Sequence, residues 1–129
     1  SEQSRINLND TKDEINNKIK KAKTDTLPIP GNKKDLENRP EAKNLLGIYS
    51  SLKDQNIINT LDEFSGKNFS EFKKKLTEIT IEKIYPISIE VNRLKNDEAF
   101  IQKVLNEGNA RAIDISSKKI KDMKKIVGF

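Results

Sequence analysis

The sequence predicts an all-α fold, a helical bundle of about six helices in which one long helix is kinked at Pro86. Two observations predict this fold. Apolar residues recur at spacings of three and four along most of the chain, which is the period of an amphipathic helix. Most glycines and prolines fall between these periodic segments, where helices begin or end, and Gly47 and Pro86 are the exceptions. Of the 129 residues, 35% are charged and 33% are apolar, a polar balance that still allows one modest core.

The first helix is expected to begin after Asn9 or Asp10, because either side chain can cap the free amides of a first turn. Its apolar face carries Ile15, Ile19 and Ala22, at i, i+4 and i+7. Acidic residues open this segment and lysines close it, as the helix dipole favours.

The segment 26–38, TLPIPGNKKDLEN, contains two prolines and a glycine and is expected to be a connecting loop. Pro40 then suits the first turn of a second helix, because a missing amide costs nothing there. A short third helix is expected to end at Gly66. The apolar faces of these two helices consist of Leu45, Leu46, Tyr49 and Leu52, and of Ile57, Ile58, Leu61 and Phe64.

Ser70 is expected to cap the long helix, which keeps a helical period on both sides of Pro86. The run ITIEKIYPISIEV also alternates β-branched residues, so a strand is the competing interpretation, although helical flanks favour the helix. A fifth helix is expected after Asn96 and is expected to break at Gly108, before a last helix over 109–127. The periodic residues of these segments are Phe72, Leu76, Ile79, Ile87, Val91, Leu94, Phe100, Val104, Leu105, Ala112, Ile113, Ile120, Met123 and Val127.

The composition excludes several kinds of chemistry. The sequence has no cysteine and no histidine, which removes disulfides, thiolate metal sites, the commonest metal ligand and the usual general base. The stretch PIPGNKK lacks the second glycine and the following Ser or Thr of a P-loop. Carboxylates such as Glu78, Glu82 and Glu90 have no histidine partners and are expected to be surface charges. We therefore expect no catalytic residue and no metal site in this chain.

The charge and hydropathy of the chain point to a nucleic-acid partner and away from a membrane. No apolar run approaches the roughly 20 residues that cross a bilayer, and the N-terminus does not resemble a signal peptide. We expect a soluble protein that is not exported. The net charge of +5 favours contact with phosphates, because clustered Lys and Arg release their counterions.

The lysines of KIKKAKTD, residues 18–25, are the first basic cluster. On a helical projection they point to every side except the apolar face, so at most two, such as Lys18 with Lys21, share one side. An ordinary solvated surface is therefore the competing interpretation.

The last helix carries a basic stripe, but Asp114 lies within it and is placed to pair with Lys118. The stripe consists of Arg111, Lys118, Lys121 and Lys125. Asp114 therefore favours a salt-bridged surface over a stripe that faces phosphates. Tyr49 and Tyr85 could stack on bases, yet each lies near an apolar face, which favours packing in the core.

Four motifs occur in an order that resembles a known family. They are SRINLND at 4–10, KIKKAKTD at 18–25, NRPEAKNLLGIYSSL at 38–52, and an ending that runs from EGNARA to IVGF. Their order and spacing resemble the C-terminal third of bacterial tryptophanyl-tRNA synthetases, from one end of the chain to the other. Residues 67–96 match mainly in helix pattern.

The resemblance implies a cytoplasmic, homodimeric class I enzyme that activates tryptophan with ATP and magnesium and transfers it to tRNA(Trp). It also implies that SRINL follows the mobile KMSKS loop, so that this loop and the nucleotide-binding domain are missing from the chain. The chain alone is then expected to be inactive. Residues 1–25 would be the connector and first helix, 26–38 a loop, and 39–129 the helical bundle that reaches the anticodon.

Within this resemblance, six basic residues are our candidates for contact with tRNA. They are first Lys18 and Lys21, and then Arg93, Lys103, Arg111 and Lys118. The competing interpretation of the chain is an independent helical module that binds RNA or protein through a generic basic surface.

Overall fold

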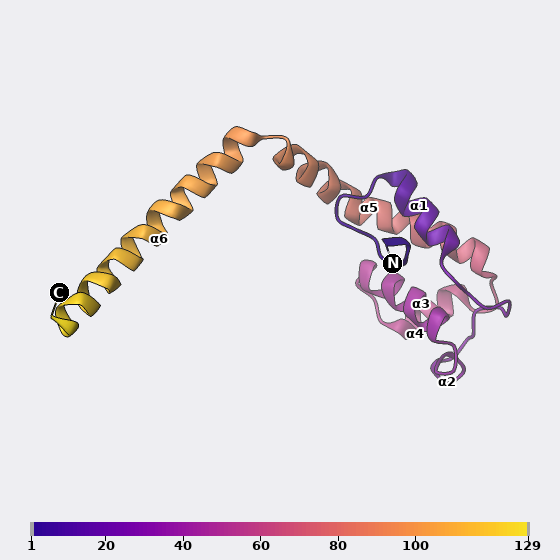
Figure 1. The fold of residues 1–129 in the computed structure, drawn as a ribbon. Helices are drawn as coiled ribbons and strands as arrows, with labels where there is room; N and C mark the ends of the chain where they lie inside the picture. The colour runs from indigo at the N-terminus through magenta and orange to yellow at the C-terminus, as the bar shows by residue number, and fades with distance from the viewer. Residues whose placement is uncertain (1, 129) are drawn as a thin grey trace. The chain divides into compact units, whose positions relative to one another are not determined.

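A computed structural model describes residues 2–128 of the chain, and every regular element in this range is helical (Figure 1). The all-α prediction is confirmed. The predicted first part begins at Ser1 and the predicted last part ends at Phe129, and these two residues lie outside the described range. The elements are η1 (Glu2–Ser4), α1 (Lys12–Lys21), α2 (Lys33–Leu36), α3 (Pro40–Leu52), α4 (Ile57–Phe64), α5 (Phe69–Lys95) and α6 (Glu98–Val127). The chain divides into two compact units, residues 1–91 and 92–129, and the division falls within α5. None of the helices in the described range is long and apolar enough to cross a bilayer.

The core of the first unit is built from one face each of α1, α3, α4 and α5. Three aromatic rings lie at its centre: the centroid of Tyr49 is 4.9 Å from that of Phe64, and Phe64 is 5.0 Å from Phe72. The Tyr49 hydroxyl donates to a carboxylate oxygen of Glu63 at 2.9 Å, and burial with this bond raises the pKa of Tyr49 to about 12. The expected core packing of Tyr49 is confirmed, since its side chain is 2% exposed. The buried apolar residues are Ile15, Ile19, Ile29, Leu36, Ala42, Leu45, Leu46, Tyr49, Leu61, Phe64, Phe69, Phe72, Leu76 and Ile79.

Two helix starts differ from the prediction. Thr11, rather than Asn9 or Asp10, caps α1: its hydroxyl accepts from the Glu14 amide at 3.3 Å, and the Glu14 carboxylate accepts from the Thr11 amide at 2.8 Å. This reciprocal arrangement is a capping box, which satisfies two free amides at once. Similarly, α5 begins one residue before Ser70, and the preceding residue, Asn68, accepts from the Glu71 amide at 2.9 Å.

The segment 26–38 is a loop only in part. Residues 33–36 form the short helix α2, and Asn32 caps it by accepting from the Asp35 amide at 2.9 Å. Ile29 is buried, its amide donates to the Lys67 carbonyl at 3.0 Å, and its carbonyl accepts from the Gly66 amide at 2.9 Å. The segment is therefore fastened to the turn after α4, which ends before Gly66 as predicted.

Helix α5 passes through Pro86 as one helix, and the competing strand interpretation of this stretch is wrong. Proline has no amide to donate to the carbonyl four residues earlier, and its ring crowds that carbonyl. The expected bend of the helix axis at Pro86 stays a prediction.

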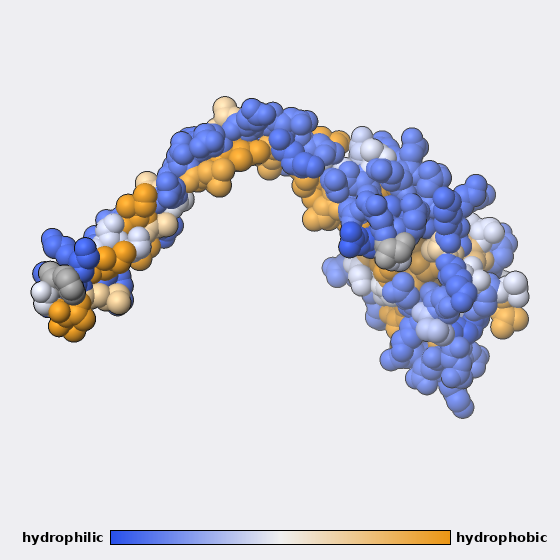
Figure 2. Space-filling view, viewed as in Figure 1, coloured by the Kyte–Doolittle hydropathy of each residue, from blue (hydrophilic) through white to orange (hydrophobic). Residues whose placement is uncertain are grey.

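Helix α6 corrects the expected break at Gly108, because a single helix runs from Glu98 to Val127. One glycine costs about 1 kcal/mol in a helix interior, which the good helix formers around it evidently tolerate. Asp97 caps the helix by accepting from the Phe100 amide at 3.0 Å, and Gly128, at a φ of 85°, ends it. No side chain of α6 is buried, and Figure 2 shows apolar side chains at its surface.

Candidate nucleic-acid interface

The chain enters α1 through a turn at residues 7–10 that is closed by the carboxylate of Asp10. This carboxylate accepts from the Asn7 amide at 2.8 Å, from the Asn7 side-chain amide at 3.3 Å, and from the Lys18 ammonium at 2.6 Å. The Asp10 amide in turn donates to the Asn7 carbonyl at 3.1 Å. Burial of the Asp10 carboxyl raises its pKa, but the hydrogen bonds from Lys18 and Asn7 outweigh this effect and hold the pKa below its ordinary value.

Lys18 therefore differs from the exposed lysine that the helical projection predicts. Its side chain is only 9% exposed, and that of Asp10 is 7% exposed. The projection placed Lys18 on the solvated side of the helix, and this is wrong, because the side chain is buried and its ammonium pairs with Asp10. Direct contact of Lys18 with a phosphate would require the Asp10–Lys18 pair to open.

Three exposed lysines lie at the C-terminal end of the first helix or just beyond it. Lys20, Lys21 and Lys23 are all exposed, and Lys23 pairs with Glu41 at 3.3 Å. The structure gives Lys21 no ion pair within the described range. The Lys73 ammonium lies beside them, donating to the Lys20 carbonyl at 3.2 Å and the Ala22 carbonyl at 2.6 Å. Burial lowers the pKa of Lys73, and the cation complements the C-terminal end of the helix dipole.

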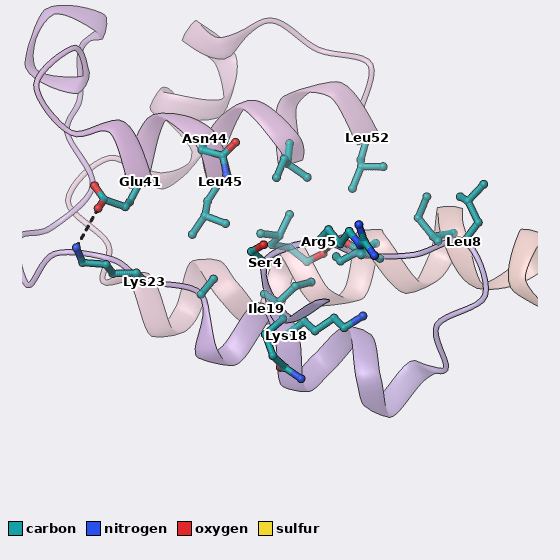
Figure 3. Close-up of a pocket in the computed structure, with 17 residues that line it drawn as sticks. Ser4, Arg5, Leu8, Lys18, Ile19, Lys23, Glu41, Asn44, Leu45 and Leu52 are labelled. Atoms are coloured by element: carbon teal, nitrogen blue, oxygen red, sulfur yellow. Dashed lines mark hydrogen bonds and ion pairs between the residues drawn. The ribbon is translucent and has the colours of Figure 1, made fainter. Parts of the chain in front are cut away.

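A cleft of about 470 Å³ lies beside this lysine cluster, between α1, α3, α5 and the N-terminal segment at residues 3–8 (Figure 3). Its lining is mainly apolar. The Lys23–Glu41 pair lies at one end of the cleft and Leu8 at the other. Arg5 comes from the N-terminal segment, and Lys18 also reaches the lining. The cleft is thus lined both by the N-terminal segment and by the lysine-containing C-terminal end of α1.

Arg39 makes several contacts that the sequence did not predict. Its guanidinium donates to both oxygens of Asp25, at 2.8 and 2.6 Å, and to the carbonyls of Pro28 at 2.8 Å and Leu27 at 3.1 Å. It also lies 5.7 Å from the ring centroid of Phe69. The hydrogen bonds from Arg39 lower the pKa of the Asp25 carboxyl. Arg39 therefore fixes the proline-containing loop and is not a free cation.

The remaining candidates lie in the second unit, on the end of α5 and on α6, where all are exposed. Three of them form i, i+4 ion pairs: Arg93 with Asp97 at 3.8 Å, Lys103 with Glu107 at 4.0 Å, and Lys118 with Asp114 at 2.7 Å. The last pair confirms the salt bridge that the sequence predicts. Arg111 has no ion pair with another residue of the described range.

The six candidates are divided between the two units and differ in how accessible their charges are. Lys21 and Arg111 are exposed and without an ion pair in residues 2–128, three candidates are paired at the surface, and Lys18 is buried. No group of three acidic side chains within this range could hold a metal ion. Tyr85 is half-buried, with the Lys12 ammonium 4.6 Å from its ring centroid. Contact with tRNA stays a prediction for all six residues.

Comparison with known proteins gives matches of two kinds. A family model described as tRNA synthetases class I (W and Y) matches residues 1–85. The whole chain is 43% identical to the tryptophan--tRNA ligase of Agrobacterium fabrum and 42% identical to that of Mesorhizobium japonicum, and covers 36% of each relative. It is 40% identical to the tryptophan--tRNA ligase of Rickettsia felis, of which it covers 38%. The chain thus spans little more than a third of these relatives and matches their C-terminal part.

Proposed function

The chain belongs to the class I tRNA synthetases of the tryptophan and tyrosine group, and on this basis we propose that it is the C-terminal, helical, tRNA-binding part of a tryptophan--tRNA ligase. The observation that carries the proposal is the end-to-end match of 37–43% identity to such ligases. In the complete enzyme, the remaining part would activate tryptophan with ATP and magnesium, with release of pyrophosphate, and the tryptophanyl group would then be transferred from AMP to a hydroxyl of tRNA(Trp) as an ester. A homodimer in the cytoplasm is part of the same proposal.

In the complete enzyme, we expect ATP with magnesium to be held by the preceding nucleotide-binding domain. The PIPGNKK segment of this chain is in keeping with this, because its Asn32 is used to cap α2. No group of acidic side chains among residues 2–128 is placed to hold a metal ion. We expect the 129-residue chain alone to be inactive.

The proposed role of this chain is to hold the tRNA in position through phosphate contacts. Lys20, Lys21 and Lys23 are exposed at one end of α1, and Arg111 is exposed on α6. Such cations fix the register of a nucleic acid, whereas unstacked bases are recognised by stacking and by hydrogen bonds to their edges. Tyr49 is excluded as a stacking platform because it is buried in the core.

A charge reversal tests the proposal. Lys21→Glu in the complete ligase should raise the KM for tRNA severalfold and leave tryptophan-dependent pyrophosphate exchange unchanged, because a phosphate contact is lost and the chemistry is untouched. Lys53→Glu, an exposed lysine just after α3, is the matched control. An unchanged KM for Lys21→Glu would reject this residue as a contact.

Two measurements on the chain alone test the wider proposal. Pyrophosphate exchange by the 129-residue chain should be undetectable, and appreciable turnover would contradict the assignment of the chemistry to the preceding domain. A titration should show tighter binding of tRNA(Trp) than of bulk RNA. Equal binding of both would favour the competing interpretation, a generic interaction module. The acidic residues within the basic clusters also favour that interpretation.

A further inference from the structure

The Asp10–Lys18 ion pair holds the N-terminal segment to the middle of α1. Asp10 receives three donors at its carboxylate, two from Asn7 and one from Lys18. Both side chains are at least nine-tenths buried. The turn at 7–10 therefore cannot leave α1 without breaking a desolvated charge pair.

The pair also determines where the preceding residues lie. The segment at 3–8 forms one wall of the cleft, and in Figure 3 Ser4 and Arg5 lie between α1 and α3. Beyond the turn, the Thr11 capping box fixes the start of α1. Both the Asp10–Lys18 pair and the Thr11 capping box thus fix the chain just after residues 3–8.

A buried ion pair at this position is poorly explained by stability alone. Two well-packed apolar residues in place of a buried pair are often as stabilising or more so, because desolvation offsets the attraction between the charges. What the pair supplies is geometric specificity, because the one Asp10 carboxylate meets both Asn7 donors and the Lys18 ammonium, whereas an apolar contact has no preferred direction.

We propose that Asp10 and Lys18 are positioning residues, whose pairing fixes residues 3–8 in the cleft and so sets the connection between this helical unit and the preceding part of the ligase. This proposal rests on the proposed function, because the match to the C-terminal part of the relatives puts the remaining two thirds of their length before this segment. It assigns Lys18 a role that differs from a phosphate contact. Small misplacements of bound groups can cost about a hundredfold in rate, so a loosened connection should lower kcat.

The charges of the two residues make the proposal testable in the complete ligase. Asp10→Asn and Lys18→Met should each lower kcat for aminoacylation about tenfold and leave the KM for tRNA within about twofold. The double variant should lose no more than either single variant, because all three break the same contact. A phosphate contact predicts otherwise: Lys18→Met alone would raise the KM, and Asp10→Asn, which removes a negative charge, would not.

Controls separate positioning from stability. The reactions are run well below the melting temperature of each variant, where loss of stability alone leaves kcat unchanged. Glu78→Gln, which breaks the exposed Lys75–Glu78 pair of 2.8 Å, should leave kcat unchanged as well. Lys18→Arg, which keeps the charge, should restore part of the lost kcat. Asp10→Glu keeps the charge but displaces the carboxylate, and should lower kcat about threefold even if Asp10→Asn fails to fold.

The outcomes distinguish two kinds of failure. If the unsubstituted ligase charges tRNA(Trp) and the folded Asp10 and Lys18 variants match its kcat, the positioning role is overturned and the proposed function stands. If the unsubstituted ligase does not charge tRNA(Trp), the proposed function itself fails.

Discussion

Replacing Arg39 should loosen the loop between α1 and α3, and the expected loss can be worked out from its contacts. Arg39→Met removes four hydrogen bonds, two to the Asp25 carboxylate and two to backbone carbonyls. The Arg39 side chain is 14% exposed and that of Asp25 is 36% exposed, so water replaces part of what the carboxylate loses. Hydrogen bonds to charged groups contribute about 1.5–3 kcal/mol when buried, and exposed pairs less than about 1 kcal/mol.

We therefore expect Arg39→Met to lower the free energy of unfolding by about 2 kcal/mol, and Arg39→Lys by about 1 kcal/mol. A lysine can keep one contact with Asp25, but it has no planar fork to reach the carbonyls of Leu27 and Pro28 as well. Urea unfolding followed by far-ultraviolet circular dichroism measures both values, with the exposed Lys74→Met as control. If Arg39→Met lies within about 0.5 kcal/mol of the unsubstituted chain, as surface substitutions do, the loop does not depend on this guanidinium.

Three further predictions concern stability. Because folding lowers the pKa of Asp10, its ionised carboxylate contributes to the free energy of unfolding above the ordinary carboxyl pKa, and this contribution is lost as the pH falls through the folded pKa. With Asp10→Asn, the free energy of unfolding should therefore fall less steeply as the pH is lowered. An equal slope for both proteins would contradict the role of this group. A Cβ at Gly31 would lie 2.7 Å from the Ser65 hydroxyl, so Gly31→Ala should cost about 1 kcal/mol, and Ser65→Ala should recover most of it in the double variant. Pro86→Ala should restore a helical hydrogen bond and raise the free energy of unfolding by about 1–3 kcal/mol; a less stable variant would mean that the packing of α5 needs the proline.

The sequence predicts what is local and misses what depends on distant partners. Most of the periodic apolar residues of α3 and α4 join the core because helical spacing brings them to one side, whereas Ile58 is wrongly predicted and is 57% exposed. Helix starts are harder, since several polar residues in a row can cap. Thr11 is chosen over Asp10 because Glu14 returns its hydrogen bond, while Asp10 is engaged by Lys18. The signal of the capping box, T-x-x-E, was present in the sequence.

The errors in the candidate site have the same origin. A lysine is assigned to the surface unless a carboxylate is known to reach it, and Asp10 lies eight residues before Lys18, beyond the reach of pattern rules for helix pairs. Arg39 contacts Asp25, fourteen residues away, through the path of a loop, which no periodicity describes. The predicted helix break at Gly108 depends only on the residue being glycine. The residues on both sides favour a continuous helix, and one helix runs through this position.

The contact between Lys73 and the end of α1 has a consequence for how the chain is made. Helices of ten residues are marginal in water when isolated, and the carbonyl of Ala22 obtains its ammonium partner only from a residue 51 positions later. On the ribosome, α1 leaves the exit tunnel before Lys73 does, so the Ala22 carbonyl lacks this partner until Lys73 has emerged. The lysine-rich helix α1 therefore stays without this contact until residues up to Lys73 have been synthesised.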